Sequence, residues 1–300
     1  MKKRLFPCLG LFMFTVMTIM ALTPMTASAA SISATSSRQP HLLLHQALMK
    51  PNVVTPFASS NLSYHGGPVM TGTANAYAIF WEPGNNVESN YNSLIQRYFG
   101  DIGGSSLYHN NIQYTNSSGG YASNAAFAAS WVDTRSYTRS PLLDSDIQGE
   151  VSHALSSKGW RASSNNIFFV FTGRNEDICI DSSRSECASN TFCAYHSNFG
   201  STLYATMPYA ASFSCNPGHS PNNNDADQTI NVTSHEQIEA ATDPQGNAWY
   251  DSSGYEIGDK CAWKFGSINS SGGDVVWNSH NYIVQKEWDN KARGCVLSGP

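Results

Sequence analysis

Charged residues are scarce in this sequence. Only 13% of its 300 residues are Asp, Glu, Lys or Arg, and the formal net charge at pH 7 is −5. Beyond the three basic residues at positions 2–4, no run of Lys and Arg occurs in the chain. Binding to a phosphate backbone or an anionic membrane surface requires such a basic patch. We therefore expect no nucleic-acid partner.

Several sequence signatures are also missing. The chain has no CxxC pair, which disfavours a cysteine-ligated zinc site. It has no GxSxG motif, which argues against a nucleophilic serine on a strand-to-helix turn. No internal repeat is visible, and no long apolar run follows the one at the N-terminus. These absences leave a non-repetitive globular protein as the class to consider.

The N-terminus has the pattern of a secretory signal peptide over residues 1–29. Three basic residues at positions 2–4 precede an apolar run, and residues 27–29 read Ala-Ser-Ala, an A-x-A cleavage site. The mature chain should begin near Ala30, with a formal net charge of −8 after the three basic residues are lost. A retained membrane anchor is the alternative, which the adjacent cleavage site disfavours. We predict a secreted, extracellular protein with no membrane association after cleavage.

An even number of cysteines follows the leader. The six are Cys179, Cys187, Cys193, Cys215, Cys261 and Cys295. Behind a signal peptide, six cysteines predict three disulfides formed in an oxidising compartment and no free thiol. Sequence alone allows fifteen pairings of six cysteines. We favour Cys179–Cys187, Cys193–Cys215 and Cys261–Cys295.

The pattern of apolar residues predicts one domain behind a flexible arm. Residues 30–60 are weakly patterned and rich in Ser, Thr and Pro, with a short helix expected over residues 41–48. Residues 61–300 are expected to form the domain. Apolar periodicity predicts strands over residues 76–81, 112–114, 167–171 (central), 203–209, 275–277 and 282–284. It predicts helices over residues 91–99 and 144–158 and around His235. Residues 122–132 could be a strand or a loop, and residues 179–193 should form a disulfide-rich loop.

This order of elements is that of a zincin peptidase domain. We therefore predict the α/β (α+β) class: a single zincin-like domain, with a mixed twisted sheet, packed helices and disulfides. By analogy with that fold, residues 203–209 should form the edge strand beside the active helix, and Pro208 is consistent with an edge. An edge strand in that position can hold an extended peptide by strand addition.

The motif SHExxE, residues 234–239, is the centre of the functional argument. On a helix, His235 and Glu239 stand four residues apart and face the same way, so they can bind one cation. Glu236 lies about 100° further round, where a helix of the HExxH type carries its general base. Glutamate in place of the second histidine reduces the preference for zinc over calcium. We predict a divalent metal, zinc in the first place and calcium as the alternative.

A third metal ligand must come from beyond this helix. The segment EIGDKC places Glu256 and Asp259 after two glycines that let the chain turn back. We favour Glu256 as the ligand and keep Asp259 as second choice. Asp243, followed by Pro244, is better placed to fix the turn that ends the helix. His196 could approach the cleft, but we interpret it as a loop or core histidine.

The sequence resembles the EXORDIUM/phosphate-induced family of secreted plant proteins and their bacterial relatives. The most specific similar segment is SHEQIEAATDP with NAWYD and EIGDKC, and YHGGPVMTG, YNSLIQRYF, IFFVFTG, FCAYHSNFG and LYAT add to it. The chain differs in its low-complexity arm and some loop lengths, and its short leader MKKR resembles bacterial ones. Since the family is known mainly by growth and cell-wall phenotypes, the resemblance implies an extracellular protein without fixing a reaction.

Two functional hypotheses follow from these patterns. In the first, the protein is a secreted metal-dependent hydrolase, a metallopeptidase in which Glu236 activates water while His235, Glu239 and Glu256 hold the metal. Its partner would be a peptide or cell-wall substrate, and the protein a monomer. In the second, it is a non-catalytic extracellular EXORDIUM-like protein that binds cell-wall or carbohydrate surfaces, with a structural metal or none.

Overall fold

A computed structural model describes residues 40–48 and 60–300 of the chain. The expected signal peptide and most of the expected N-terminal arm lie outside these described residues. Everything described below belongs to one unit of the chain.

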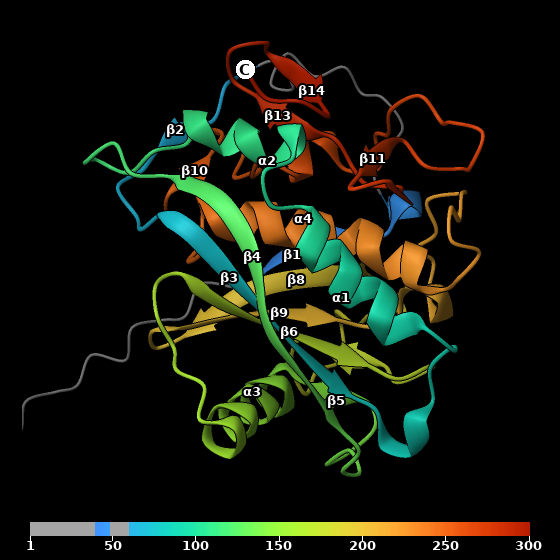
Figure 1. Cartoon of the computed structure of the whole chain (residues 1–300). Coiled ribbons are helices and arrows are strands. Elements are labelled where there is room, and N and C mark those ends of the chain that lie inside the picture. The colour runs from blue at the N-terminus through green and yellow to red at the C-terminus, as the bar shows by residue number, and fades with distance from the viewer. Residues whose placement is uncertain (1–39, 49–59) are drawn as a thin grey trace, which may run out of the picture. The chain divides into compact units, whose positions relative to one another are not determined.

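A six-stranded mixed sheet forms the centre of this unit (Figure 1). The order of its strands is β1-β8-β9-β6-β3-β4. The four strands β9, β6, β3 and β4 are parallel to one another. Strand β8 is antiparallel to β9, and β1 is antiparallel to β8. The strands are β1 (His41–Leu44), β3 (Gly72–Trp81), β4 (Ala122–Asp133), β6 (Asn166–Thr172), β8 (Phe192–Phe199) and β9 (Thr202–Met207). The predicted α/β class with a mixed sheet is therefore confirmed.

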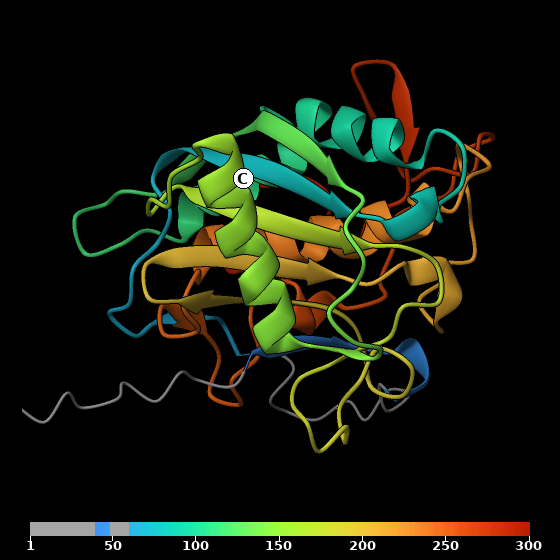
Figure 2. The same ribbon diagram turned by 90° about the horizontal axis from the view of Figure 1, so that it is seen from below.

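Helices cover both faces of the sheet. Helices α1 (Tyr91–Asp101) and α4 (Ala226–Thr242) pack on one face and α3 (Asp144–Lys158) on the other, as Figures 1 and 2 show. The apolar strand β6 serves both layers because its side chains alternate: Phe169 and Phe171 join the α1/α4 core, while Phe168 and Val170 join the α3 core. A continuous apolar run is what a strand buried on both faces requires.

Smaller elements complete the unit. They are helix α2 (Ser106–His109) and the paired strands β2 (Ser63–Tyr64) with β10 (Trp249–Tyr250), β5 (Leu142–Leu143) with β7 (Ile178–Cys179), β11 (Val275–Trp277) with β12 (His280–Tyr282), and β13 (Glu287–Asp289) with β14 (Gly294–Val296). The later pairs lie on the α4 side of the sheet (Figure 1). This C-terminal layer buries α4 against the sheet, which matters for the site described below.

Most of the expected elements are confirmed. The two strands expected over residues 76–81 and 167–171 are β3 and β6, and β6 is internal to the sheet as predicted. Helices α1 and α3 lie where periodicity placed them, and Gly159 ends α3 in the left-handed conformation. The ambiguous segment over residues 122–132 is a strand, and the strand expected over residues 275–277 is β11. Its hairpin partner β12 ends at Tyr282, so the strand expected over residues 282–284 lies two residues earlier than predicted.

Two local predictions are wrong. Residues 41–48 form strand β1 and a 3₁₀ turn (Gln46–Leu48) in place of a short helix, because β1 pairs with β8 and buries Leu43. Part of the expected arm is thus an edge of the sheet. The strand expected over residues 112–114 is instead a 3₁₀ turn (Asn110–Gln113), where the buried Tyr114 hydroxyl donates a hydrogen bond to the Trp288 carbonyl.

The predicted edge strand is also wrong. Residues 203–209 contribute β9, which lies between β6 and β8 and is not an edge. Pro208 follows the last residue of β9, so it removes no ladder hydrogen bond. The strand that intervenes, β8, begins at the end of the segment expected to be a disulfide-rich loop. The order of strands in the sheet depends on pairing between distant parts of the chain, which the periodicity of apolar residues does not reveal.

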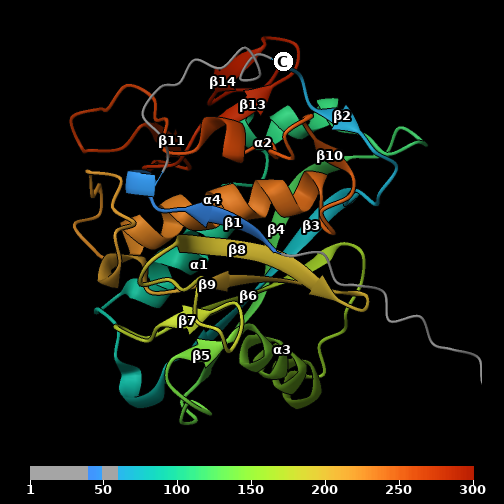
Figure 3. The same ribbon diagram turned by 180° about the vertical axis from the view of Figure 1, so that it is seen from behind.

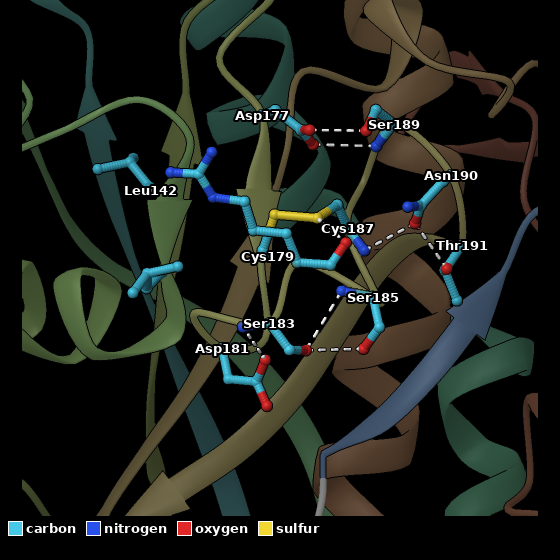
Figure 4. Close-up of a disulfide and its surroundings, with 12 residues drawn as sticks. Leu142, Asp177, Cys179, Asp181, Ser183, Ser185, Cys187, Ser189, Asn190 and Thr191 are labelled. Atoms are coloured by element: carbon cyan, nitrogen blue, oxygen red, sulfur yellow. Dashed lines mark hydrogen bonds between the residues drawn. A yellow bond between two sulfur atoms is a disulfide. The ribbon is translucent and has the colours of Figure 1, made fainter.

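The three favoured disulfides are confirmed. They join Cys179 to Cys187, Cys193 to Cys215, and Cys261 to Cys295. Around the first, the Asp177 carboxylate accepts hydrogen bonds from the backbone and hydroxyl of Ser189 (Figure 4). Three disulfides are typical of an oxidising, extracellular environment. No helix within residues 40–48 and 60–300 is both long and apolar enough to cross a membrane.

Candidate metal centre

Helix α4 is enclosed on all sides. Every residue in it except Gln228 is buried, including the polar side chains of the SHExxE motif. Polar groups removed from water must find partners inside the protein, or their desolvation destabilises the fold. The helix ends as predicted at Asp243, whose Oδ1 accepts hydrogen bonds from the backbone amides of Asn247 at 2.6 Å and Ala248 at 2.7 Å.

His235 and Glu239 converge as their spacing predicts. Nε2 of His235 lies 3.2 Å from Oε1 of Glu239, and both side chains are fully buried. Although this distance is short, neither ring nitrogen of His235 makes a hydrogen bond of acceptable geometry. The two side chains thus face a common point, with both ring nitrogens of His235 unpaired.

Gly258 brings the segment EIGD against this helix. A Cβ atom at Gly258 would lie 2.5 Å from Nδ1 of His235 and 2.9 Å from Oε1 of Glu239, so only glycine fits there. As a result the amide of Asp259 donates a hydrogen bond of 2.9 Å to Glu239 Oε1, and its Oδ1 lies 3.8 Å from His235 Nε2. The returning acidic segment is where the sequence placed it.

Glu256, the favoured third ligand, lies on a different side of Glu239. One donor atom from each of His196, Glu239 and Glu256 fits within a mutual distance of 4.8 Å. A second such group consists of His235, Glu236 and Glu239. Glu256 is fully buried, and neither of its carboxylate oxygens accepts a hydrogen bond. All five predicted site residues therefore gather at one place, with Glu239 common to both groups.

His196 is a member of this centre that sequence reasoning passed over. It projects from β8, with Nδ1 3.1 Å from Oε2 of Glu236 and 3.8 Å from Oε2 of Glu239. Its Nε2 lies 3.2 Å from the carbonyl oxygen of Asp243. The available signal was a histidine inside the apolar run FCAYH, but only the pairing of β8 beside β9 shows that it faces α4.

Glu287 of β13 is a second unforeseen member. Its side chain is fully buried and neither oxygen has a hydrogen-bond partner. Burial raises the pKa of this carboxyl well above its usual range, while the nearby His235 acts to lower it. The amide of Trp288 donates to the carbonyl of Ile257, which attaches β13 to the EIGD segment.

The electrostatics of the centre show strong coupling between these groups. Burial favours the neutral form of Glu239, yet His235 and then His196 outweigh it and hold its pKa at about 2. Burial likewise opposes protonation of both histidines, but the carboxylates beside them raise the pKa to about 10 for His235 and about 9 for His196. Without a metal ion, the ring nitrogens of His235 and His196 that face these carboxylates therefore carry protons.

Carboxylates outnumber cationic groups in this part of the protein. Six acidic side chains gather around three histidines, His41, His196 and His235; they are Glu236, Glu239, Asp243, Glu256, Asp259 and Glu287. Among the described residues, no Lys or Arg forms an ion pair with any of the six; the nearby Lys260 pairs with Asp251. Imidazole nitrogens with carboxylate oxygens are ligands of zinc, and carboxylates alone suit calcium.

Strand β1 covers the side of the centre formed by β8. Strand β1 is the edge strand beside β8 and runs near α4 in Figure 3, and His41 in β1 places Nδ1 3.5 Å from Oδ2 of Asp259. A small pocket reaches His196 from outside, and its walls include Pro40, His41 and residues 244–246. Among the described residues, β1 and this small pocket thus form the outer boundary of the centre near His196.

Comparison of the chain with protein-family models, with curated proteins and with solved structures finds no match in any of the three. The resemblance to the EXORDIUM family and the likeness to zincins therefore stay predictions.

Proposed function

We propose that the cluster on α4 binds divalent metal and that the protein is a secreted metal-dependent hydrolase, a metallopeptidase of the HExxE kind. The observation that carries the proposal is the set of buried donor atoms without partners. Both ring nitrogens of His235 and both carboxylate oxygens of Glu256 lack hydrogen bonds. Since leaving such groups unpaired in the interior destabilises a protein, a cation that satisfies them is the economical explanation. Zinc fits the mixed nitrogen and oxygen donors best, with calcium as the alternative.

The chain supplies the remaining parts of such a site. His235 and Glu239 would hold the metal from α4, with Glu256 or Asp259 from the returning segment. When bound, the metal would polarise a substrate carbonyl and increase the acidity of water. Glu236 is placed to take a proton from the attacking water, because its Oε1 is free while Oε2 faces His196 at 3.1 Å.

A second candidate function is supported by the burial of the centre. A non-catalytic extracellular protein of the EXORDIUM kind, which binds cell-wall or carbohydrate surfaces, needs its metal only for stability. The complete burial of Glu236 and Glu239, with β1 paired beside β8 at the sheet edge, is the arrangement expected of a structural ion. The two candidates differ in whether the metal meets a substrate.

The test combines metal analysis with hydrolysis. Purified mature protein is assayed for bound metal, and then for cleavage of casein and of a mixed peptide library with and without chelator. Glu236→Gln should retain metal and lose activity by about 10²–10⁴-fold, the usual effect of removing a general base. His235→Ala should lose both. Glu150→Gln makes the same exchange at a buried glutamate on α3, outside the centre, and should change neither.

Three outcomes decide between the candidates. Cleavage that survives Glu236→Gln excludes Glu236 as the base. Bound metal without cleavage, with zinc, manganese and calcium each supplied, supports the non-catalytic binding protein. Absence of any bound metal refutes the metal-dependent function itself.

A further inference from the structure

The two carboxylate oxygens of Glu239 face two different histidines. Oε1 lies 3.2 Å from Nε2 of His235, and Oε2 lies 3.8 Å from Nδ1 of His196. We propose that the centre is built for two divalent cations bridged by the Glu239 carboxylate. This inference rests on the proposed metal-binding function and specifies how many ions that function uses.

The first cation position lies on the α4 side of Glu239. His235 Nε2 and Glu239 Oε1 are 3.2 Å apart, and Asp259 Oδ1 is 3.8 Å from the same nitrogen. Two donors held about 2.0–2.2 Å from one tetrahedral ion lie about 3.3–3.6 Å from each other. The separations of 3.2 Å and 3.8 Å lie on either side of this range, within about 0.2 Å of it, so small side-chain shifts would let these donors share an ion. His235 makes no hydrogen bond that would compete for its lone pair.

The second cation position lies on the β8 side. Nδ1 of His196 is 3.1 Å from Oε2 of Glu236 and 3.8 Å from Oε2 of Glu239. His196, Glu239 and Glu256 form one group with donor atoms within 4.8 Å of one another, in which Oε2 of Glu256 lies 3.7 Å from Nε2 of His196. The hydrogen bond from His196 Nε2 to the Asp243 carbonyl leaves Nδ1, whose present hydrogen-bond partner is Glu236 Oε2, as the nitrogen that would bind the ion. A ligating histidine ordinarily donates its other N–H to a backbone carbonyl or carboxylate in this way.

Unpaired buried atoms favour the second position. An ion held by His235 belongs to a donor set that does not include Glu256. Both oxygens of Glu256 are buried without a hydrogen bond, so one ion at the first position leaves them unsatisfied. Paired ions in hydrolytic sites stand about 3.5–4 Å apart, the separation that one bridging carboxylate supports.

The experiment counts ions in the full mature chain. Protein loaded with Zn²⁺ and freed of excess ion should contain two zinc ions per chain by elemental analysis. His235→Gln and His196→Gln should each retain one. His280→Gln, which alters a half-exposed histidine paired with Asp101 outside the centre, should retain two. Replacement of zinc by Mn²⁺ gives an independent readout, since two bridged Mn²⁺ ions produce a spin-coupled resonance spectrum in place of isolated six-line signals.

The wild-type protein alone can overturn the proposal, so the test does not depend on the variants folding. One zinc per chain with an isolated Mn²⁺ signal refutes the bridged pair and leaves a one-ion hydrolase or structural site standing. No zinc and no Mn²⁺ refutes the proposed metal function as well. Two zinc ions per chain that His235→Gln and His196→Gln both leave unchanged would also refute it, because the ions would then lie elsewhere.

Discussion

Two groups of buried carboxylates lie on opposite sides of the central sheet, and they are balanced differently. On the α3 side, Arg135 donates hydrogen bonds of 2.7 Å to Asp133 and 2.6 Å to Glu150. On the α4 side, Glu236 and Glu239 have histidines beside them but no arginine or lysine in an ion pair among the described residues. Burial of acidic groups alone therefore does not indicate a metal. The α4 side differs from the α3 side in that its carboxylates have no permanently charged partner among the described residues.

Chelation should separate the two groups most strongly. A ligand present at about 1,000 times its dissociation constant stabilises the folded state by about 4 kcal/mol, which corresponds to about 10 °C in the melting temperature of a domain this large. Chelator should lower the melting temperature of wild type and Glu150→Gln alike. Glu239→Gln should already melt low and respond little. If chelator left the wild-type melting temperature unchanged, neither the α3 nor the α4 group of carboxylates would bind a stabilising metal.

Removal of Arg135 should have the next largest effect, on the other side of the sheet. Arg135→Met leaves Asp133 and Glu150 without their shared cation, at a cost of about 2–3 kcal/mol for lost charged hydrogen bonds. Denaturant titration measures the change, and chelator sensitivity should stay as in wild type. If Arg135→Met altered metal content, the two groups would not be independent.

Gly258→Ala tests how closely the EIGD segment must approach α4. The added Cβ collides with the His235 ring, so we expect weaker metal binding and a loss of about 1–3 kcal/mol from overpacking. The matched control is Gly149→Ala in the exposed face of α3, where a Cβ meets nothing within 4 Å. That change should stabilise the protein by about 0.5–1 kcal/mol, since alanine favours helix over glycine. Equal responses of the two variants would contradict the close approach.

The smallest effect concerns pH on the α3 side. Burial, followed by the neighbouring Asp133 carboxylate, raises the pKa of Glu150 from 4.5 to about 8. Between pH 4.5 and about 8, the carboxyl of Glu150 therefore keeps its proton in the folded state but has lost it in the unfolded state. The contribution of Glu150 to stability should therefore fall as pH rises from 4.5 to 8. Melting temperatures across this range should decline by a few degrees for wild type and by less for Glu150→Gln.

Sequence reasoning located the parts of the centre that lie close together along the chain. The spacing of His235 and Glu239 on one helix is local information, and the glycines before EIGD show that the chain can return. Sequence reasoning favoured Glu256 as the third ligand and kept Asp259 as second choice, and the structure brings both residues close to Glu239. The disulfide pairing was correct for a similar reason: each bridge joins neighbours in cysteine order.

What sequence reasoning missed depends on strands that meet from distant parts of the chain. His196 faces α4 only because β8 inserts beside β9 as an antiparallel strand, and Glu287 reaches the centre only through the attachment of β13 to Ile257. The short leucine-rich segment His41–Leu44 has no strong preference of its own, and its pairing with β8 determines that it is a strand. Helix and strand propensities are local, so they could not reveal these contacts.

The position of β1 also has a consequence for the order in which the protein assembles. This strand comes from the beginning of the described chain, yet its partner β8 is synthesised much later, with His41 opposite His196. Pairing across such a separation comes late in folding, because the entropy of closing the intervening chain must be overcome first. We expect metal to enter while the β8 side is still open and to exchange slowly once β1 has docked. Labelled zinc added during refolding should thus be incorporated far faster than labelled zinc added to the folded protein. The metal ion present during folding would then be the one that the folded chain retains.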